Sequence, residues 1–325
     1  MSNLKTDIII SRNSIKAVEE RIKDDLRVFQ TAEWLSVTGE AFVASVCYDE
    51  NDRIKGYLPL VETTKFGIKG YHIPPYTPYF GPVVLETDLF KKTKVIEKLL
   101  KPFFKSKHID FIISPNDKDI VNFSSIGFSV EASQTHIIDS KTDYGINSIH
   151  GSKRRYLKKL KDLHNTGKLF IKSGREAISS LIALNDATEK RAGFKGNSHV
   201  LKLLLEKFGT EETVSVVFTE NGEPLSGAFY PHDSYYAYHL INASARHNDN
   251  LLDKANLLSA FNAVEKTINS GKSFDFEGSN IPGVAGFYRM MGGMPAINLR
   301  LQKSNSYFYS LMRAGLKIKK ERYAL

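Results

Sequence analysis

Two stretches of the chain resemble each other and decide the fold: residues 45–59, SVCYDENDRIKGYLP, and residues 215–231, SVVFTENGEPLSGAFYP. Each begins with an apolar run rich in β-branched and aromatic residues, passes through a polar turn and continues into a second run, which is the pattern of a β-hairpin. The turns fall at residues 50–52 and 220–222, where asparagine, acidic residues and glycine favour chain reversal. The repetition predicts an internal duplication.

The elements predicted around the two hairpins follow one order, with helices before each hairpin and a strand, a helix and a strand after it. In the first half the expected strands are 8–10, 42–48, 54–61, 109–114 and 136–138, and the expected helices are 14–26, 32–38 and 89–104. In the second half the expected helices are 156–166, 176–192, 199–208 and 251–270, and the expected strands are 213–219, 224–230, 235–242, 274–277 and 297–302.

A polar, turn-rich segment at 139–152 separates the two halves. The predicted fold class is therefore α/β (α+β), with two tandem units at 1–148 and 149–325. Each unit is expected to be a mixed, mostly antiparallel sheet flanked by helices.

The composition is that of an ordinary globular protein, with 42% hydrophobic and 25% charged residues among 325. The first ten residues lack a cationic stretch followed by an apolar run, and no window is apolar for long enough to span a bilayer. A single cysteine, Cys47, excludes an internal disulfide, and the histidines lack metal-ligand spacing. These features predict a cytoplasmic protein without a transmembrane segment or a structural metal.

The net charge of +9 could serve a polyanionic partner or only keep the protein solvated. Six of the nine residues in 153–161, KRRYLKKLK, are basic, and more basic residues follow in the tail that begins at Arg313. If 153–161 is helical, its charged side is either a solvated face or an anion site. Arg154 and Arg155 are the candidates for binding a phosphate or carboxylate, because guanidinium groups bind both in a bidentate manner.

The order of helices and strands is that of the GNAT N-acyltransferase fold, and two such units in one chain resemble the FemAB-like family. The stretches that carry the resemblance are 29–40, FQTAEWLSVTGE; 56–84, GYLPLVETTKFGIKGYHIPPYTPYFGPVV; 151–172, GSKRRYLKKLKDLHNTGKLFIK; and 274–293, FDFEGSNIPGVAGFYRMMGG. Characterised members of the family add amino acids to peptidoglycan precursors from aminoacyl-tRNA, and some relatives are described as acetyltransferases.

The resemblance implies an N-acyltransferase that moves an acyl (acetyl) or aminoacyl group to an amine of an amino sugar or cell-envelope precursor. The implied donor is an acyl-CoA or an aminoacyl-tRNA, with no tightly bound cofactor. The implied acceptor is a small molecule, a nucleotide sugar or a lipid-linked precursor, and DNA is not an expected partner.

Two departures leave the donor open. Residues 243–258, ASARHNDNLLDKANLL, lack the glycine pair of the loop that cradles pyrophosphate in acyl-CoA-dependent GNAT enzymes. Arg246 and Lys254 could still form a phosphate site there, with Asp249 and Asn250 as capping residues. The chain also lacks the long helical arm of some family members that use aminoacyl-tRNA.

The strand at the start of 274–293 supplies the candidate catalytic carboxylates. Alternation would place Phe274 and Phe276 in the core and Asp275 and Glu277 together on the opposite face. Glu277 could accept a proton from the attacking amine or orient it. The alternative is that Glu277 caps the following bend, through the side chain of residue 279 or 280.

The neighbouring strand adds two tyrosines, Tyr236 and Tyr238, which share one face. One of them could protonate the leaving group or line an acceptor pocket, and the alternative is simple packing. Glycines 278, 283 and 286 are expected to bend the chain tightly over the site. Arg289 is then placed to reach an anionic ligand.

No Ser-His-Asp or Cys-His constellation is evident, and an N-acyltransferase does not require one, because it can hold the amine beside the acyl donor without a covalent enzyme intermediate. Walker and Rossmann glycine patterns are also absent from the sequence. The alternative functions on the same fold are a non-catalytic binding module and a basic RNA-binding protein.

Overall fold

The computed structural model describes residues 4–38, 41–65, 67–114, 121–193, 196–278, 281–307, 309 and 311–312. The chain forms two compact units: unit 1 comprises Met1–Ser133 and Ile297–Leu325, and unit 2 comprises Gln134–Ala296. The chain passes from one unit to the other in β7 (Ser129–Ile138) and returns in β14 (Met294–Ser304). The polar segment 139–152 therefore lies inside unit 2, and the segment after Ala296 belongs to unit 1.

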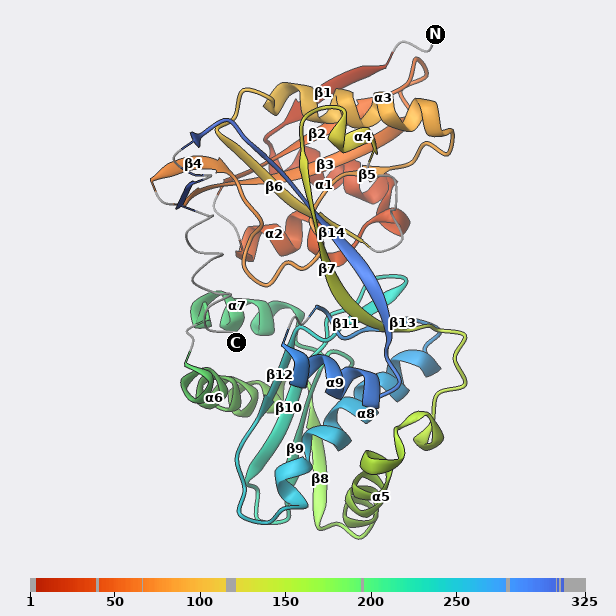
Figure 1. The fold of residues 1–325 in the computed structure, drawn as a ribbon, viewed down its shortest axis with the longest axis vertical. Helices are drawn as coiled ribbons and strands as arrows, with labels where there is room; N and C mark the ends of the chain where they lie inside the picture. Colours follow the sequence, from red (N-terminus) through yellow and green to blue (C-terminus); the bar gives the residue numbers. More distant parts are fainter. Residues whose placement is uncertain are drawn as a thin grey trace. The chain divides into compact units, whose positions relative to one another are not determined.

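Unit 1 is a sheet with helices on both faces (Figure 1). Its strands are β1 (Lys5–Ile9), β2 (Ala41–Tyr48), β3 (Ile54–Lys65), β4 (Ile68–Tyr71), β6 (His108–Ile113) and the unit 1 part of β14, in that spatial order, with β5 (Val83–Val84) beside β3. Its helices are α1 (Arg12–Arg21), α2 (Ala32–Thr38), α3 (Leu89–Leu100) and α4 (Val121–Ser124), with 3₁₀ turns at Lys23–Asp25, Val28–Gln30 and Lys101–Phe103. Neighbouring strands are antiparallel except for β4 and β6, which are parallel.

Unit 2 contains a four-stranded antiparallel sheet of β12 (Ile241–Ser244), β10 (Pro224–Phe229), β9 (Val214–Thr219) and β8 (Leu169–Ser173), in that order. Two further strands, β11 (Tyr236–Tyr238) and β13 (Ser273–Asp275), are parallel, and β13 also pairs with the end of β7. The helices are α5 (Gly151–Asn165), α6 (Arg175–Ala192), α7 (Ser198–Phe208), α8 (Asn256–Asn269) and α9 (Pro282–Met290), with 3₁₀ turns at Ile146–Ser148 and Leu252–Lys254. The buried side of α8 packs with Phe274 and Phe276 in the core of this unit.

The two predicted hairpins are present as β2–β3 and β9–β10. Their turns match in detail, because Asp52 has φ 55° and Gly222, at the same place in the second hairpin, has φ 82°. Both hairpins also contain a register shift. From β1 to β7 and from β8 to β14, the elements follow one order: a strand, two helices, antiparallel strands, a helix, a strand, a helix and a strand. This order agrees with a duplication, and superposition of the two halves stays a prediction.

The segment after β13 differs from the predicted bend. Pro282 begins α9, so Gly283 and Gly286 lie inside a helix, and the prediction that they bend the chain over the site is wrong. Proline suits the first turn of a helix because it lacks the N–H that would be unpaired there. At position 278 a glycine is needed for a steric reason, since a Cβ there would lie 2.8 Å from the carbonyl oxygen of Gln134.

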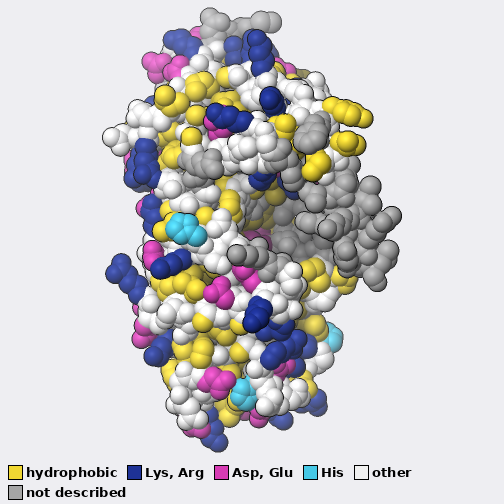
Figure 2. Space-filling view, turned by 90° about the vertical axis from the view of Figure 1, so that its left-hand side faces the viewer, with side chains coloured by type: hydrophobic (Ala, Val, Ile, Leu, Met, Phe, Trp, Pro, Cys, Tyr) yellow, Lys and Arg dark blue, Asp and Glu magenta, His cyan; other side chains and the backbone are white. Residues whose placement is uncertain are grey.

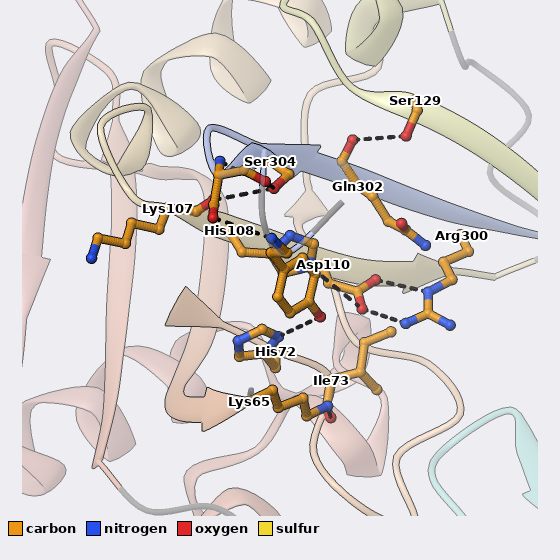
Figure 3. Close-up of polar contacts among 12 residues, drawn as sticks. Lys65, His72, Ile73, Lys107, His108, Asp110, Ser129, Arg300, Gln302 and Ser304 are labelled. Atoms are coloured by element: carbon orange, nitrogen blue, oxygen red, sulfur yellow. Dashed lines mark hydrogen bonds and ion pairs between the residues drawn. The ribbon is translucent and has the colours of Figure 1, made fainter. Parts of the chain in front are cut away.

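A buried polar cluster in unit 1 fastens the C-terminal strand to the sheet (Figure 3). Arg300 of β14 donates from Nε to Oδ1 of Asp110 on β6 at 2.9 Å, and also from its second nitrogen to the other carboxylate oxygen. The rings of His72 and His108 stack with centroids 4.8 Å apart, and Tyr309 packs on His108 at 4.1 Å. These contacts hold the chain after Ile297 against β6.

Candidate functional site

In unit 2 the chain leaves strand β13 at His239, the residue that follows β11. β11 pairs with β13 in parallel, and the His239 N–H still donates to the carbonyl of Asp275 at 2.8 Å. The chain then turns at Leu240 and continues as β12, which is the edge strand of the other sheet and pairs with β10. Because β11 and β13 are parallel, their carboxyl ends point to the same side, and strands that diverge in this way open a crevice in which ligands bind.

A pocket of about 370 Å³ lies where β12 ends. The starts of α5 and α8, the end of α6 and one side of α9 complete its wall. The polar lining residues are Lys153, Arg191, Ser244, Arg246, Asp253, Lys254 and Asn256, and the apolar ones are Leu257, Phe287 and Met290. The pocket thus combines charged groups at one side with a thioether and an aromatic ring from α9.

Positive charge exceeds negative charge in this lining. Asp253 is the acid of the lining, and its carboxylate lies 2.8 Å from Nζ of Lys254 and 3.6 Å from Arg246. The hydrogen bond from Lys254 lowers the pKa of Asp253, so the carboxylate stays ionised and neutralises one cation. Lys153 and Arg191 add further charge, and the start of α8 presents the positive end of a helix dipole. The pocket is therefore suited to an anion.

The overall surplus of lysine and arginine does not produce this pocket by itself. On the face drawn in Figure 2, dark blue Lys and Arg side chains are spread over the surface, with magenta Asp and Glu among them. The basic tail from Arg313 lies outside the described residues.

Glu277 stands just beyond β13 in a backbone conformation that few non-glycine residues adopt, with φ 59°. Its N–H donates to Oδ1 of Asp275 at 2.8 Å, and the same oxygen accepts from the hydroxyl of Thr135 at 2.5 Å. Asp275 is 1% exposed and therefore acts here as the acceptor that holds the turn. The proposed cap of Glu277 through residue 279 or 280 lies outside the described residues.

The carboxyl group of Glu277 is poised to take up a proton. The residue as a whole is half-buried, but its Oε1 is shielded from solvent and has no hydrogen-bond partner among the described residues. Burial, and then the charge of Asp275, raises the pKa of Glu277 well above its usual value. A carboxylate with a raised pKa is a better proton acceptor near neutral pH than an ordinary glutamate.

Three further side chains lie beside the end of β13, and sequence reasoning missed all of them. Tyr288 of α9 stacks on Phe276 with centroids 4.7 Å apart, and burial, then Glu277 and Asp275, raises the pKa of its hydroxyl. His239 and His136 are buried, and their rings lie 6.5 Å and 5.8 Å from that of Tyr288. Burial lowers the pKa of His239 to about 4, so its ring is neutral.

The predicted anion-binding arginines of α5 divide into two kinds. Arg154 donates from Nε to the carbonyl of Ile149 at 3.1 Å and from its terminal nitrogen to that of Asn147 at 2.9 Å, so it caps the turn that leads into the helix. Arg155 is exposed, with its guanidinium 5.8 Å from the ring of Tyr156. The pocket cation of this helix is Lys153, one residue earlier.

The remaining predicted residues are placed as follows. The hydroxyl of Tyr238 donates to Asp233 at 2.6 Å, and Tyr236 stacks on Tyr238 at 6.0 Å, so this pair supports the loop before β11. Arg289 is exposed in the last turn of α9. Burial, and then the positive charge of Arg289, lowers the pKa of His136. Lys254 lines the pocket. The pocket thus brings Lys254 together with Arg246, the pair that the sequence suggested, and with Lys153 and Arg191, which sequence reasoning did not single out, whereas Glu277 lies with aromatic groups.

The described residues include no candidate metal site and no candidate membrane span. No cluster of three or more His, Cys, Asp or Glu side chains there could hold a metal ion. None of the helices in the described part of the chain is both long enough and apolar enough to cross a bilayer.

The fold has close counterparts among solved structures. FemX is 14% identical in sequence and superposes with a TM-score of 0.69 over 94% of this chain and 99% of its own. The C-terminal domain of a protein assigned as lysylphosphatidylglycerol synthetase in Agrobacterium fabrum is 11% identical and superposes with a TM-score of 0.58 over 94% of this chain and 97% of its own. L-PGS from Bacillus licheniformis is 14% identical, with a TM-score of 0.56 over 94% of this chain and 95% of its own. No family model and no curated protein matches the sequence. The chain is therefore a mixed α/β protein with the fold of FemX and of these synthetases, as the GNAT-like order of its elements predicted.

Proposed function

We propose that this chain is an N-acyltransferase whose acyl donor binds through its phosphate groups in the cationic pocket of unit 2. The observation that carries the proposal is the parting of β12 from β13 at His239, with the pocket at the end of β12 and Glu277 at the end of β13. The fold shared with FemX and the resemblance to the FemAB-like family support the same reaction class. The donor is an acyl-CoA or an aminoacyl-tRNA, since both carry phosphate groups together with a reactive acyl group.

In this proposal the phosphates contact Lys153, Arg191, Arg246 and Lys254, and the start of α8 contributes N–H dipoles. Charge-assisted hydrogen bonds of this kind are roughly twice as strong as neutral ones. Phe287 and Met290 supply an apolar wall on the α9 side. The acyl group would then lie toward the parted strands, where strand edges offer backbone N–H groups to a carbonyl oxygen.

The chemistry requires a neutral amine and a proton for the leaving group. Glu277 takes the proton from the attacking nitrogen, because its raised pKa allows it to hold that proton near neutral pH. Tyr288 keeps its own proton, since its pKa is raised, so its hydroxyl can donate a hydrogen bond to the departing thiolate or ribose oxygen. The proton that the leaving group takes up is then the one that Glu277 accepted from the amine. The acceptor is proposed to be the amine of an amino sugar or cell-envelope precursor, on the strength of the resemblance to the FemAB-like family.

The test is steady-state kinetics with each donor class on three variants. R246A/K254A is expected to raise the donor KM at least about tenfold with little change in kcat, because it removes ground-state charge contacts. E277Q is expected to lower kcat about one hundred-fold while donor binding persists. K158A/K159A, which removes two exposed lysines of α5 that are outside the pocket lining, serves as the control.

Unchanged donor KM in R246A/K254A would remove the pocket from the donor site, and unchanged kcat in E277Q would remove Glu277 from the chemistry. Donor binding without any turnover in the wild type would favour a non-catalytic binding module. Equal loss of RNA binding in the control and the pocket variant would instead favour a general basic RNA-binding surface, which depends steeply on salt.

A further inference from the structure

The outer face of unit 1 exposes large apolar side chains in the first turn of α3 and at β1. Phe90 is 86% exposed and Leu89 is 66% exposed in the first turn of the helix. Ile8 is 45% exposed on β1, and Ile10, just after that strand, is 75% exposed. Single exposed apolar residues are common on protein surfaces, but several on one face mark an interaction site.

These residues belong to one face because of how α3 packs. The helix lies on β1, β2 and β3 (Figure 1). A Cβ at Gly56 of β3 would touch Val95 and Leu99 of α3, so α3 covers this side of the sheet. On the same side, Gly56 pairs with Cys47 of β2, and Cys47 pairs with Thr6 of β1. Alternation along β1 then places Ile8 on the same side as Thr6, the side that α3 covers, and Ile10 follows just after the strand.

Lysines occupy the exposed side of α3 after its apolar first turn. Phe90, Lys94 and Lys98 follow one another at intervals of four residues, so they form one row along the exposed side of the helix. Lys91 and Lys101 are exposed as well, and Glu97 is the exposed acid of α3. The face is therefore cationic with apolar side chains at its margins.

We propose that this face binds the surface of an anionic lipid bilayer, with Phe90 and Leu89 inserted among the acyl chains and the lysines at the level of the phosphates. Interfacial helices combine aromatic and aliphatic side chains with lysine in this way, and each lysine near an anionic leaflet adds to the attraction. Long lysine side chains can keep their ammonium groups at the head groups while their methylenes are buried. A protein partner fits less well, since lysine is depleted from protein–protein interfaces.

The experiment is co-sedimentation of the full chain with vesicles of phosphatidylcholine alone or with a quarter phosphatidylglycerol. The wild type is expected to bind the anionic vesicles, less strongly as salt rises. L89S/F90S and K94A/K98A should each weaken binding by about tenfold or more. I8S/I10S tests the same face without altering α3. R155A/K158A is the matched control, because it removes exposed cations of α5 where no large apolar side chain is exposed.

Thermal melts should be unchanged in all variants, because the altered side chains are exposed. Failure of the wild type to bind anionic vesicles would overturn the proposal. An equal loss of vesicle binding in R155A/K158A and in K94A/K98A would also overturn it, because it would show general electrostatic attraction. A wild-type dimer that L89S/F90S converts to a monomer without vesicles would show that the face joins two copies of the chain.

Discussion

At the scale of single residues, the candidate base depends on an unusual backbone angle that the sequence did not reveal. Alternation along a strand predicted that Asp275 and Glu277 would share a face, and it correctly placed Phe274 and Phe276 in the core. The strand ends at Asp275, however, and Glu277 has φ 59°. Two-residue periodicity cannot apply beyond the last strand residue, so the carboxyl groups have different roles.

Replacing Asp275 by asparagine tests this division of roles. An asparagine oxygen can still accept from Thr135 and from the Glu277 N–H, so the turn should persist. Loss of the negative charge should lower the pKa of Glu277, because that charge helps to raise it. The acidic limb of the pH profile of kcat/KM is then expected at lower pH than in the wild type. A limb that stays in place or moves upward would contradict the assignment.

The buried ring of His239 leads to a prediction about how the stability of the fold depends on pH. Its folded-state pKa is about 4, below the usual value of 6.5, so the stability it confers is full above pH 6.5 and is lost as pH falls toward 4. At pH 5 the loss is roughly 2 kcal/mol. Phenylalanine fits among the rings of Phe274, Phe276 and Tyr288 and cannot be protonated.

The measurement is the urea midpoint of the wild type and of H239F at neutral pH and at pH 5. H239F should lose less stability on acidification than the wild type. His72 of unit 1, whose pKa is also about 4, contributes to both proteins and cancels in the comparison. An equal loss in both would show that His239 is already solvated or paired.

At the scale of elements, apolar periodicity located most helices and both hairpins, because these carry long or repeated patterns. It missed β4 and β8, which are short, and it merged β11 and β12 into one strand. The break at His239 arises because β11 pairs with β13 in one sheet and β12 pairs with β10 in the other. Sequence periodicity does not report which strands pair. It also missed α9, since three glycines in 278–286 suggested a loop, whereas tertiary packing of Tyr288 stabilises a helix.

The start of α5 supplies a paired test of neighbouring residues. Arg154 bonds to carbonyls of the preceding turn, so R154A is expected to lower stability by about 1–3 kcal/mol and leave donor affinity nearly unchanged. Lys153 lines the pocket, so K153A should weaken donor binding about tenfold and leave stability nearly unchanged. The check is a thermal melt and a donor titration for each variant. The reverse pattern would show that Arg154 is the anion ligand.

At the scale of the whole molecule, unit 2 is one continuous stretch of chain, whereas unit 1 is assembled from two. The repeated order of elements was predictable from sequence, but the strands in which the chain changes units were not, since β7 and β14 read as ordinary strands. All the pocket residues and Glu277 lie between Gln134 and Ala296.

Unit 2 expressed alone is therefore expected to fold and to bind the donor with a Kd within about threefold of the full chain, because the proposed contacts are all its own. Calorimetric titration of both proteins with the donor that supports turnover would measure this. A folded unit 2 that fails to bind would mean that unit 1 supplies part of the donor site.

The most direct measurement is a crystal structure of the full chain with the unreactive form of its donor, either CoA or the terminal adenosine phosphate of tRNA. The proposed function predicts phosphate oxygens within hydrogen-bond distance of at least two of Lys153, Arg191, Arg246 and Lys254, with the acyl-bearing end directed toward Glu277. A donor bound elsewhere, with these four side chains free of phosphate, would contradict it.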